Sequence, residues 1–324
     1  MRRRYFLVGL LATTGASTLW AAEPNKVYRL ALAVLSSNPT FRMRFLDRLQ
    51  QLGYTEGKNL IIDRYVVDGR SDYTEIARNM VRSTPDVIAV GLDNQFISQV
   101  AKEAFPTPVV ALIPSIAAGL VHNVSHPEGN ITGVTLDAGI EMQGKQLDIL
   151  RQAVPSVSRV AYLSNHYDWE GAWGQAMLDA GKALGISIVG VPLESTAGEE
   201  EYRKAFETIA QRSAQALVFN GLPPNFQHRA LIAKLAAEYR LPSIGWALDI
   251  VEEGQGFLSY APDYSGLPEQ WVDQIDRVFR GSKVADIPVS QPTKFILAIN
   301  LKTAKLLGLQ IPPALITQAD KVIE

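Results

Sequence analysis

The sequence predicts an α/β protein in which two doubly wound lobes, each a parallel sheet with helices on both faces, follow each other along the chain. The first observation is that short apolar runs alternate with longer segments of helical period. The second is that runs such as 86–90 (DVIAV) are apolar at every position, which is typical of parallel strands buried on both faces. The third is that the alternation begins again after Val134, and 324 residues suit two domains better than one.

The first unit alternates strands and helices from residue 27 to residue 113. The helix over 41–52 has apolar residues three or four positions apart and ends at Gly53, and Ser71 or Asp72 is the expected N-cap of the helix over 73–81. The predicted strands are 27–35, 60–67, 86–90 and 108–113, and the predicted helices are 41–52, 73–81 and 94–104.

The second unit repeats this order without an evident sequence repeat. Its predicted helices are 141–153, 169–184, 199–211 and 225–239, and its predicted strands are 159–163, 186–191, 216–219 and 242–246. A strand over 256–260, a helix over 266–279, a strand over 294–299 and a terminal helix follow. These last elements are too few for a third domain. We therefore expect them to return to both units, so that 27–136 with 262–288 forms lobe 1 and 137–261 with 289–324 forms lobe 2.

The N-terminus has the order of a secretory signal peptide. A basic start with Arg2, Arg3 and Arg4 is followed by an apolar run and by small residues up to Ala22. We expect cleavage near Ala22 and a periplasmic mature protein. The pattern R-R-x-apolar-apolar also fits twin-arginine export, so the Sec and Tat routes both stay open. An N-terminal membrane anchor is the alternative, but the apolar run is well short of the ~20 residues that span a bilayer.

Composition and missing motifs exclude several functions. With no cysteine, the chain has no disulfide, Cys-ligated zinc, iron–sulfur cluster or thiol nucleophile. A net charge of −2 gives no general attraction to nucleic acid. The dinucleotide, P-loop, G-x-S-x-G and H-E-x-x-H motifs are absent. His122 and His126 lie in a predicted loop without a clustered third ligand, so we expect no metal and no cofactor. These absences weigh against an enzyme, and we assign no catalytic residue.

Polar and aromatic residues gather where the predicted strands end. In open parallel sheets, ligands bind beyond the carboxyl ends of the strands. The candidate ligand-binding residues there are Ser36, Ser37, Asp93, Asn94, Ser115, Asn165, Tyr167, Asn220, Trp246 and Asp249. Such a set suits a small polar or zwitterionic ligand, whose ammonium would pair with Asp93 or Asp249 and whose carboxylate would meet N–H groups at helix starts. Helix capping is the alternative role for Ser37, Asn94, Asn165 and Asn225, and core packing is the alternative for Trp246.

Four segments carry a resemblance to a known family: 52–59 (LGYTEGKN), 127–133 (PEGNITG), 257–263 (FLSYAPD) and 291–295 (QPTKF), the last running into 299–305. In this order they resemble the periplasmic substrate-binding proteins of ABC transporters, in the TrpX-like branch. The resemblance implies a type I periplasmic-binding-protein fold, with two lobes joined by three crossovers and the ligand between them. It also implies amino acids or related compounds as ligands, and an ABC permease in the inner membrane as partner. We expect a monomer.

The resemblance places the three crossovers near 136–139, 246–260 and 287–293. The segments 91–95 and 114–115 depart from the family pattern where the cleft is expected, so the ligand of this chain stays open. Two other functions also stay open. One is a sensor that presents its ligand to a membrane receptor, and the other is an exported enzyme acting on a small metabolite.

Overall fold

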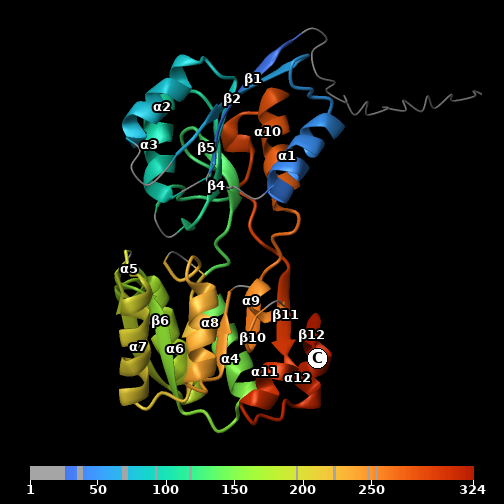
Figure 1. The fold of residues 1–324 in the computed structure, drawn as a ribbon. Coiled ribbons are helices and arrows are strands. Elements are labelled where there is room, and N and C mark those ends of the chain that lie inside the picture. The colour runs from blue at the N-terminus through green and yellow to red at the C-terminus, as the bar shows by residue number, and fades with distance from the viewer. Residues whose placement is uncertain are drawn as a thin grey trace, which may run out of the picture.

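The computed structural model describes residues 26–34, 39–67, 72–91, 93–116, 119–194, 196–221, 224–246, 248–252 and 254–324. The predicted signal peptide, Ser36 and Ser37 lie outside these residues. The chain forms two α/β lobes, one above the other in Figure 1, with connecting segments between them. None of the helices in the described ranges has the length and apolar character needed to cross a membrane.

The first lobe is built on a five-stranded parallel sheet of order β2-β1-β3-β4-β5. Its strands are β1 (Tyr28–Val34), β2 (Leu60–Tyr65), β3 (Val87–Gly91), β4 (Val109–Ile113) and β5 (Ile131–Thr135). On one face lie α1 (Pro39–Gln51) and α10 (Leu267–Phe279), and on the other lie α2 (Tyr73–Arg82) and α3 (Asn94–Ala104). The fully buried Trp271 of α10 donates from Nε1 to the Val110 carbonyl at 3.0 Å, which ties this late helix to the early sheet.

Strand β5 was not among the predicted strands. It contains Thr132, Gly133 and Thr135, so it lacks the apolar run by which the other strands were recognised. Gly133 has φ +143°, and a Cβ there would collide with the Ala111 backbone of the neighbouring strand. Close backbone approach therefore requires glycine at this position, and pairing along β4 forms the strand.

The second lobe has a seven-stranded sheet of order β12-β11-β10-β9-β8-β6-β7. Its strands are β6 (Arg159–Asn165), β7 (Ser187–Leu193), β8 (Ala216–Phe219), β9 (Ser243–Gly245), β10 (Leu258–Pro262), β11 (Phe295–Asn300) and β12 (Lys321–Ile323). The helices α4 (Glu141–Ala153), α6 (Ala172–Leu184), α11 (Leu301–Leu306) and α12 (Pro313–Gln318) cover one face. The helices α7 (Glu199–Gln211), α8 (Arg229–Glu238) and α9 (Asp249–Glu252) cover the other. The fold is therefore the predicted pair of doubly wound lobes.

One strand pair in the second sheet is antiparallel. β10 leaves this lobe at its carboxyl end to reach α10 of the first lobe, and β11 returns after the short helix η2 (Val284–Asp286). Because the chain leaves and re-enters the lobe at the same end, β11 runs against β10, with Leu258 opposite Ile299.

The predicted middle crossover over 246–260 is wrong. β10 pairs with β9 and β11, so the chain stays in the second sheet as far as Pro262. The middle crossover is therefore 263–266. The first crossover is 136–140, close to the predicted one, and the third is 291–294 because Ser290 still bonds to β5 through Gly133 and Thr135.

Side-chain contacts fasten the crossovers to one another. The Tyr264 hydroxyl donates to the Leu136 carbonyl at 2.6 Å and so joins the middle crossover to the first. The Lys294 ammonium lies 2.9 Å from the Asp263 carboxylate and joins the third to the middle. Hydrogen bonds from Ser265, together with the Lys294 ammonium, lower the pKa of the Asp263 carboxyl to about 2. The crossovers therefore act as one connected unit rather than as three separate strands.

We expect Tyr264→Phe to lower the free energy of unfolding by about 1–2 kcal/mol, because the Leu136 carbonyl loses its hydroxyl donor in a largely buried place. Urea denaturation followed by circular dichroism measures this change. Tyr167→Phe is the matched control, since the Tyr167 side chain is 71 % exposed. Equal stability of the two variants would show that the contact between the crossovers contributes nothing.

Candidate functional site

The carboxyl ends of the parallel strands in the two lobes face each other. β5 leaves the first lobe toward the second, and β10 leaves the second lobe toward the first (Figure 1). Because β1 to β4 run parallel to β5, and β6 to β9 run parallel to β10, all these strands end at the facing edges. We call these two edges, with the residues that follow each strand, the cleft edges.

On the first cleft edge, Asp93 and Ser115 already have hydrogen-bond partners. Asp93 is the N-cap of α3: one carboxylate oxygen accepts from the Phe96 N–H at 2.8 Å and the other from the Tyr73 hydroxyl at 2.6 Å. The Ser115 hydroxyl donates to the Asp137 carboxylate at 3.1 Å. Asn94 begins α3 and borders a pocket of 600 Å³ between α3 and the segment around Gly119. Asp93 therefore caps a helix and is not a free carboxylate.

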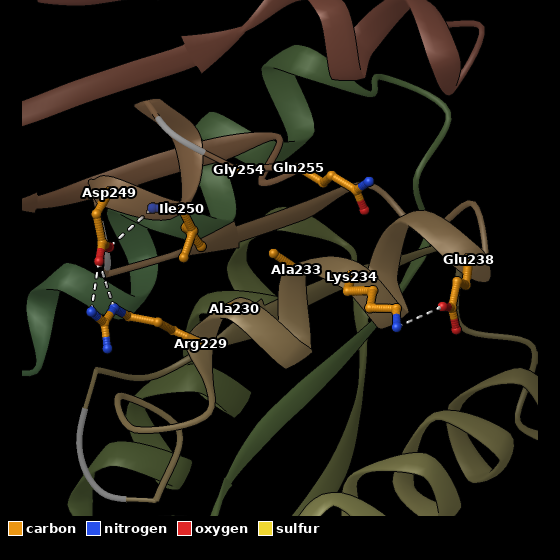
Figure 2. A pocket seen from close by; sticks show the side chains of 9 residues that line it. All are labelled: Arg229, Ala230, Ala233, Lys234, Glu238, Asp249, Ile250, Gly254 and Gln255. Carbon is orange, nitrogen blue, oxygen red and sulfur yellow. Dashed lines mark hydrogen bonds and ion pairs between the residues drawn. The ribbon is translucent and has the colours of Figure 1, made fainter.

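On the second cleft edge, the predicted residues lie in different places. Asn165 caps α5 (His166–Glu170), and Tyr167 of that helix is exposed. Asn220 is buried, and Trp246 is 9 % exposed. Asp249 pairs with Arg229 at 2.7 Å and borders a pocket of 570 Å³ beside α8, where Figure 2 shows the two side chains pointing toward each other. Asp249 is therefore already neutralised by a cation.

Asp168, in α5, is a buried carboxylate on this edge. The residue is 2 % exposed, and no ion pair among the described residues includes it. The Asn220 amide donates to its carboxylate at 2.6 Å. The pKa of Asp168 is raised to about 6: burial is the main cause, hydrogen bonds with Asn220 and Asn165 act in the opposite direction, and the nearby Asp137 carboxylate adds to the rise. Asp168 is thus a buried carboxylate whose charge a cationic group would stabilise.

A chain of buried hydrogen bonds holds Asn220 against Asp168. The Asn225 amide donates to the Asn220 side-chain oxygen and to the Leu163 carbonyl, both at 2.9 Å. The Tyr202 hydroxyl of α7 in turn donates to the Asn225 oxygen at 2.8 Å. Asn225, the first residue of the predicted helix over 225–239, thus connects Tyr202 to Asn220 and is not helical. The helix α8 begins only at Arg229. This series fixes the Asn220 amide and, through it, the carboxylate.

The predicted helix over 169–184 is two helices, because it breaks at Gly171. A Cβ at Gly171 would lie 2.8 Å from the Tyr167 carbonyl, so glycine permits the close turn between α5 and α6. α6 therefore begins four residues after Asp168, and no side chain of the described residues caps it. The first turn of a helix carries free N–H groups and a partial positive charge. α4 also starts on this edge, with Ile140 at its uncapped N-terminus.

An aromatic cluster lies beside these helix starts. Trp173 of α6 and Trp246 make an edge-to-face contact with ring centroids 6.0 Å apart, and Met142 of α4 packs with them. Tyr260 of β10 and Phe295 of β11 stack with their ring centroids 5.5 Å apart, and both pack against the same cluster. The second cleft edge thus combines a buried carboxylate, free helix N–H groups and aromatic surface.

A family model described as "ABC transporter substrate binding protein" matches residues 36–323. The chain belongs to this family. A tyrosine-binding protein of Clostridioides difficile is 21 % identical over 300 residues, which cover 89 % of this chain and 83 % of the relative.

Solved structures of low identity share the fold with this family member. One is an ABC domain in complex with L-Trp from Streptococcus pneumoniae, with TM-score 0.77 and 20 % identity over 92 % of this chain and all of the other. A conserved domain protein from Vibrio cholerae has TM-score 0.75 and 22 % identity over the same shares. The ligand-free, open structure of a C. difficile substrate-binding protein has TM-score 0.66 and 19 % identity over 92 % and 99 %. The fold is thus of the predicted type I periplasmic-binding-protein kind.

Sequence reasoning missed several residues of this substrate-binding protein's cleft edges. Asp168 follows the cap Asn165 by three positions, the spacing of a capping pair, and that signal could have drawn attention to it. Asp137 follows β5 directly, but β5 was not recognised as a strand, so its place at a strand end was hidden. Trp173 and Tyr202 reach the edge from helices, where strand-end reasoning does not search.

Proposed function

We propose that this protein captures a single α-amino acid between its lobes and delivers it, chemically unchanged, to an ABC permease in the inner membrane. The observation that carries the proposal is Asp168, a buried carboxylate with no cationic partner among the described residues, placed at the cleft edge of the second lobe. Capture and release fit the fold and the family. The signal peptide predicted from the sequence supports a periplasmic location for this function.

The ammonium group of the ligand pairs with Asp168. A buried carboxylate that must stay ionised gains most from a charge-assisted hydrogen bond, because little water competes with it. Of the carboxylates proposed from the sequence, Asp93 is exposed and caps α3, and Asp249 is paired with the Arg229 guanidinium. Asp168 is the better candidate for this reason.

The carboxylate of the ligand binds at the free N–H groups that begin α6. The two charges of an α-amino acid are separated by one carbon, and α6 begins four residues from Asp168. The aromatic cluster of Met142, Trp173 and Trp246 provides a wall for the ligand's side chain. The relatives named for tyrosine and solved with L-Trp support an amino acid as ligand.

Closure of the lobes follows from contact with both cleft edges. Asp137 lies in the first crossover, accepts from Ser115 of the first lobe and raises the pKa of Asp168 in the second. A ligand cation near both carboxylates favours the closed form by its higher affinity for that form. Ser36, Ser37 and Ser115 are the proposed contacts from the first lobe. A micromolar Kd corresponds to about −8 kcal/mol, which a few charge-assisted hydrogen bonds and an aromatic contact can supply.

Isothermal titration with each common L-amino acid tests the proposal. We expect one-to-one binding of at least one of them, and recovery of the bound compound unaltered. If none binds, the capture of an amino acid is wrong. If the bound compound is converted during incubation, the protein is an enzyme and not a binding protein.

The affinity should depend on pH with a defined sign. The folded, ligand-free protein has an Asp168 pKa of about 6, whereas the complex keeps this carboxylate ionised. Lowering the pH therefore protonates the free protein and weakens binding, by about tenfold between pH 7 and pH 5. Titration calorimetry at both pH values measures this change, since the ligand's own ammonium and carboxylate do not titrate in this range. An unchanged Kd would contradict the role of Asp168.

A further inference from the structure

One face of the second sheet changes from apolar to polar at its cleft end. Tyr162, Val218 and Ile244 belong to the core cluster between this sheet and α4. Side chains two residues apart on a strand share a face, so Ser164, Asn220 and Trp246 continue the same face beyond them. On α4, Gln143 lies one helical turn before Leu147 of the same core. These four residues therefore surround the cleft end of the space between α4 and the sheet.

Several buried polar atoms here have no hydrogen-bond partner among the described residues. Gln143 is fully buried, and neither its side-chain oxygen nor its side-chain nitrogen is bonded. The Ser164 hydroxyl, the Trp246 Nε1 and the Gln146 side-chain oxygen are in the same state. By contrast, the Gln146 nitrogen donates to the Tyr260 carbonyl at 3.0 Å. The Tyr162 hydroxyl, two residues before Ser164 on β6, is unpaired as well, so the unpaired atoms extend from the middle of this face to its cleft end.

These atoms require a partner that the described chain does not supply. Burying a primary amide without hydrogen bonds is strongly unfavourable, and folded proteins rarely leave such groups unpaired. The set contains donors (Gln143 Nε2, Trp246 Nε1), acceptors (Gln143 and Gln146 Oε1) and a hydroxyl. A group that both donates and accepts fits all of them. A hydroxyl or a carboxamide has this property, whereas an ammonium, a carboxylate or a hydrocarbon has not.

We infer that Gln143 determines the specificity of the binding site, and that the ligand is an amino acid whose side chain ends in a hydroxyl or a carboxamide. The inference rests on the proposed function, because it assumes that an α-amino acid binds at Asp168. Gln143 follows Met142, whose side chain packs with Trp173 and Trp246. A side chain that runs along this wall ends at the Gln143 amide. A site built to hydrogen-bond such a group rejects the apolar analogue, which would leave the amide unpaired.

Two matched pairs of ligands test the inference on the unmodified protein: tyrosine against phenylalanine, and glutamine against methionine. Titration calorimetry should show that the hydrogen-bonding member of at least one pair binds 10- to 100-fold more tightly than its apolar match. Equal or tighter binding of both apolar members would overturn the inference and indicate that internal water holds the amide. Binding of no amino acid at all would overturn the proposed function instead, so the two failures are distinct.

Gln143→Met tests the role of Gln143, measured with whichever pair of ligands the wild type distinguishes. We expect the preference to fall to within about twofold, through weaker binding of the hydrogen-bonding member and unchanged binding of its match. Gln152→Met is the control: it makes the same change at the far end of α4, where the Gln152 amide donates to Asp148 at 2.8 Å. A full preference retained in Gln143→Met, with native circular dichroism, overturns the inference. If that variant does not fold, the ligand pairs on the wild type decide.

Discussion

Asp168→Asn should weaken ligand binding by roughly 30- to 5000-fold while the protein stays folded. The substitution keeps the size of the side chain and leaves an oxygen to accept from Asn220, but it removes the charge that pairs with the ligand's ammonium. Losing one partner of a buried charge pair costs about 2–5 kcal/mol of binding free energy. Titration calorimetry at pH 7.5 measures this loss.

Asp249→Asn is the matched control for this substitution. Its carboxylate is half-exposed and paired with Arg229, so its loss should change the Kd by less than about threefold (Figure 2). If Asp249→Asn abolished binding and Asp168→Asn did not, the ammonium site would have to be moved to the pocket beside α8.

Asp168→Asn should also change stability, with a sign opposite to its effect on binding. The pKa of Asp168 is about 6 in the folded ligand-free protein and close to its ordinary value when unfolded. The folded state therefore binds the proton more tightly between about pH 4 and pH 6, and the wild type loses stability as the pH rises through that window. The asparagine variant lacks this loss, so we expect its melting temperature at neutral pH to equal or exceed that of the ligand-free wild type.

Asn225→Leu should be the most destabilising change at the site, lowering the free energy of unfolding by about 3 kcal/mol or more. Asn225 is fully buried, and its removal leaves the Tyr202 hydroxyl and the Asn220 oxygen without their partner, while the Leu163 carbonyl keeps only the long bond from the Asn220 N–H at 3.4 Å. Each unpaired buried group costs about 1–3 kcal/mol. Ligand binding should weaken about tenfold as well, because the Asn220 amide is no longer held against Asp168. Urea denaturation and calorimetry measure the two effects.

Tyr202→Phe removes the outermost hydrogen bond of this series and leaves the bonds of Asn225 to Asn220 and Leu163 in place. The phenylalanine keeps the buried ring and removes only the hydroxyl that donates to Asn225. We expect a loss of about 1 kcal/mol and a Kd within about twofold of the wild type. If Asn225→Leu were no more destabilising than Tyr202→Phe, the hydrogen bonds from Asn225 would not hold Asn220 against the Asp168 carboxylate.

The fold was predictable because its elements are locally consistent. Strands such as β3 (Val87–Gly91) are apolar throughout, and α3 (Asn94–Ala104) matches its prediction at both ends because the N-cap Asp93 begins it and Pro106 follows its last residues. β5 was not predicted because it is a strand through its pairing with β4 and the close approach of the two backbones, and not through a run of apolar side chains. The middle crossover was misplaced because pairing of β10 with β11, 33 residues and more later along the chain, decides where the chain leaves the lobe.

The binding site was less predictable than the fold. Strand-end reasoning found Asn220 and Trp246, which lie on the second cleft edge, but it could not show that Asp93 and Asp249 have partners. Asp168 owes its character to burial and to having no cationic partner among the described residues, and neither property can be inferred from the neighbouring sequence. The break at Gly171 likewise depends on the nearby Tyr167 carbonyl and not on helix propensity.

Native mass spectrometry gives the most direct test of an ammonium-binding cleft. The wild type and Asp168→Asn are each incubated with an equimolar mixture of the common L-amino acids, desalted without denaturation and weighed. A single adduct with the mass of one α-amino acid on the wild type, absent from the variant, is the result that we predict. A wild type without an adduct, or one that carries the same adduct as Asp168→Asn, would contradict it.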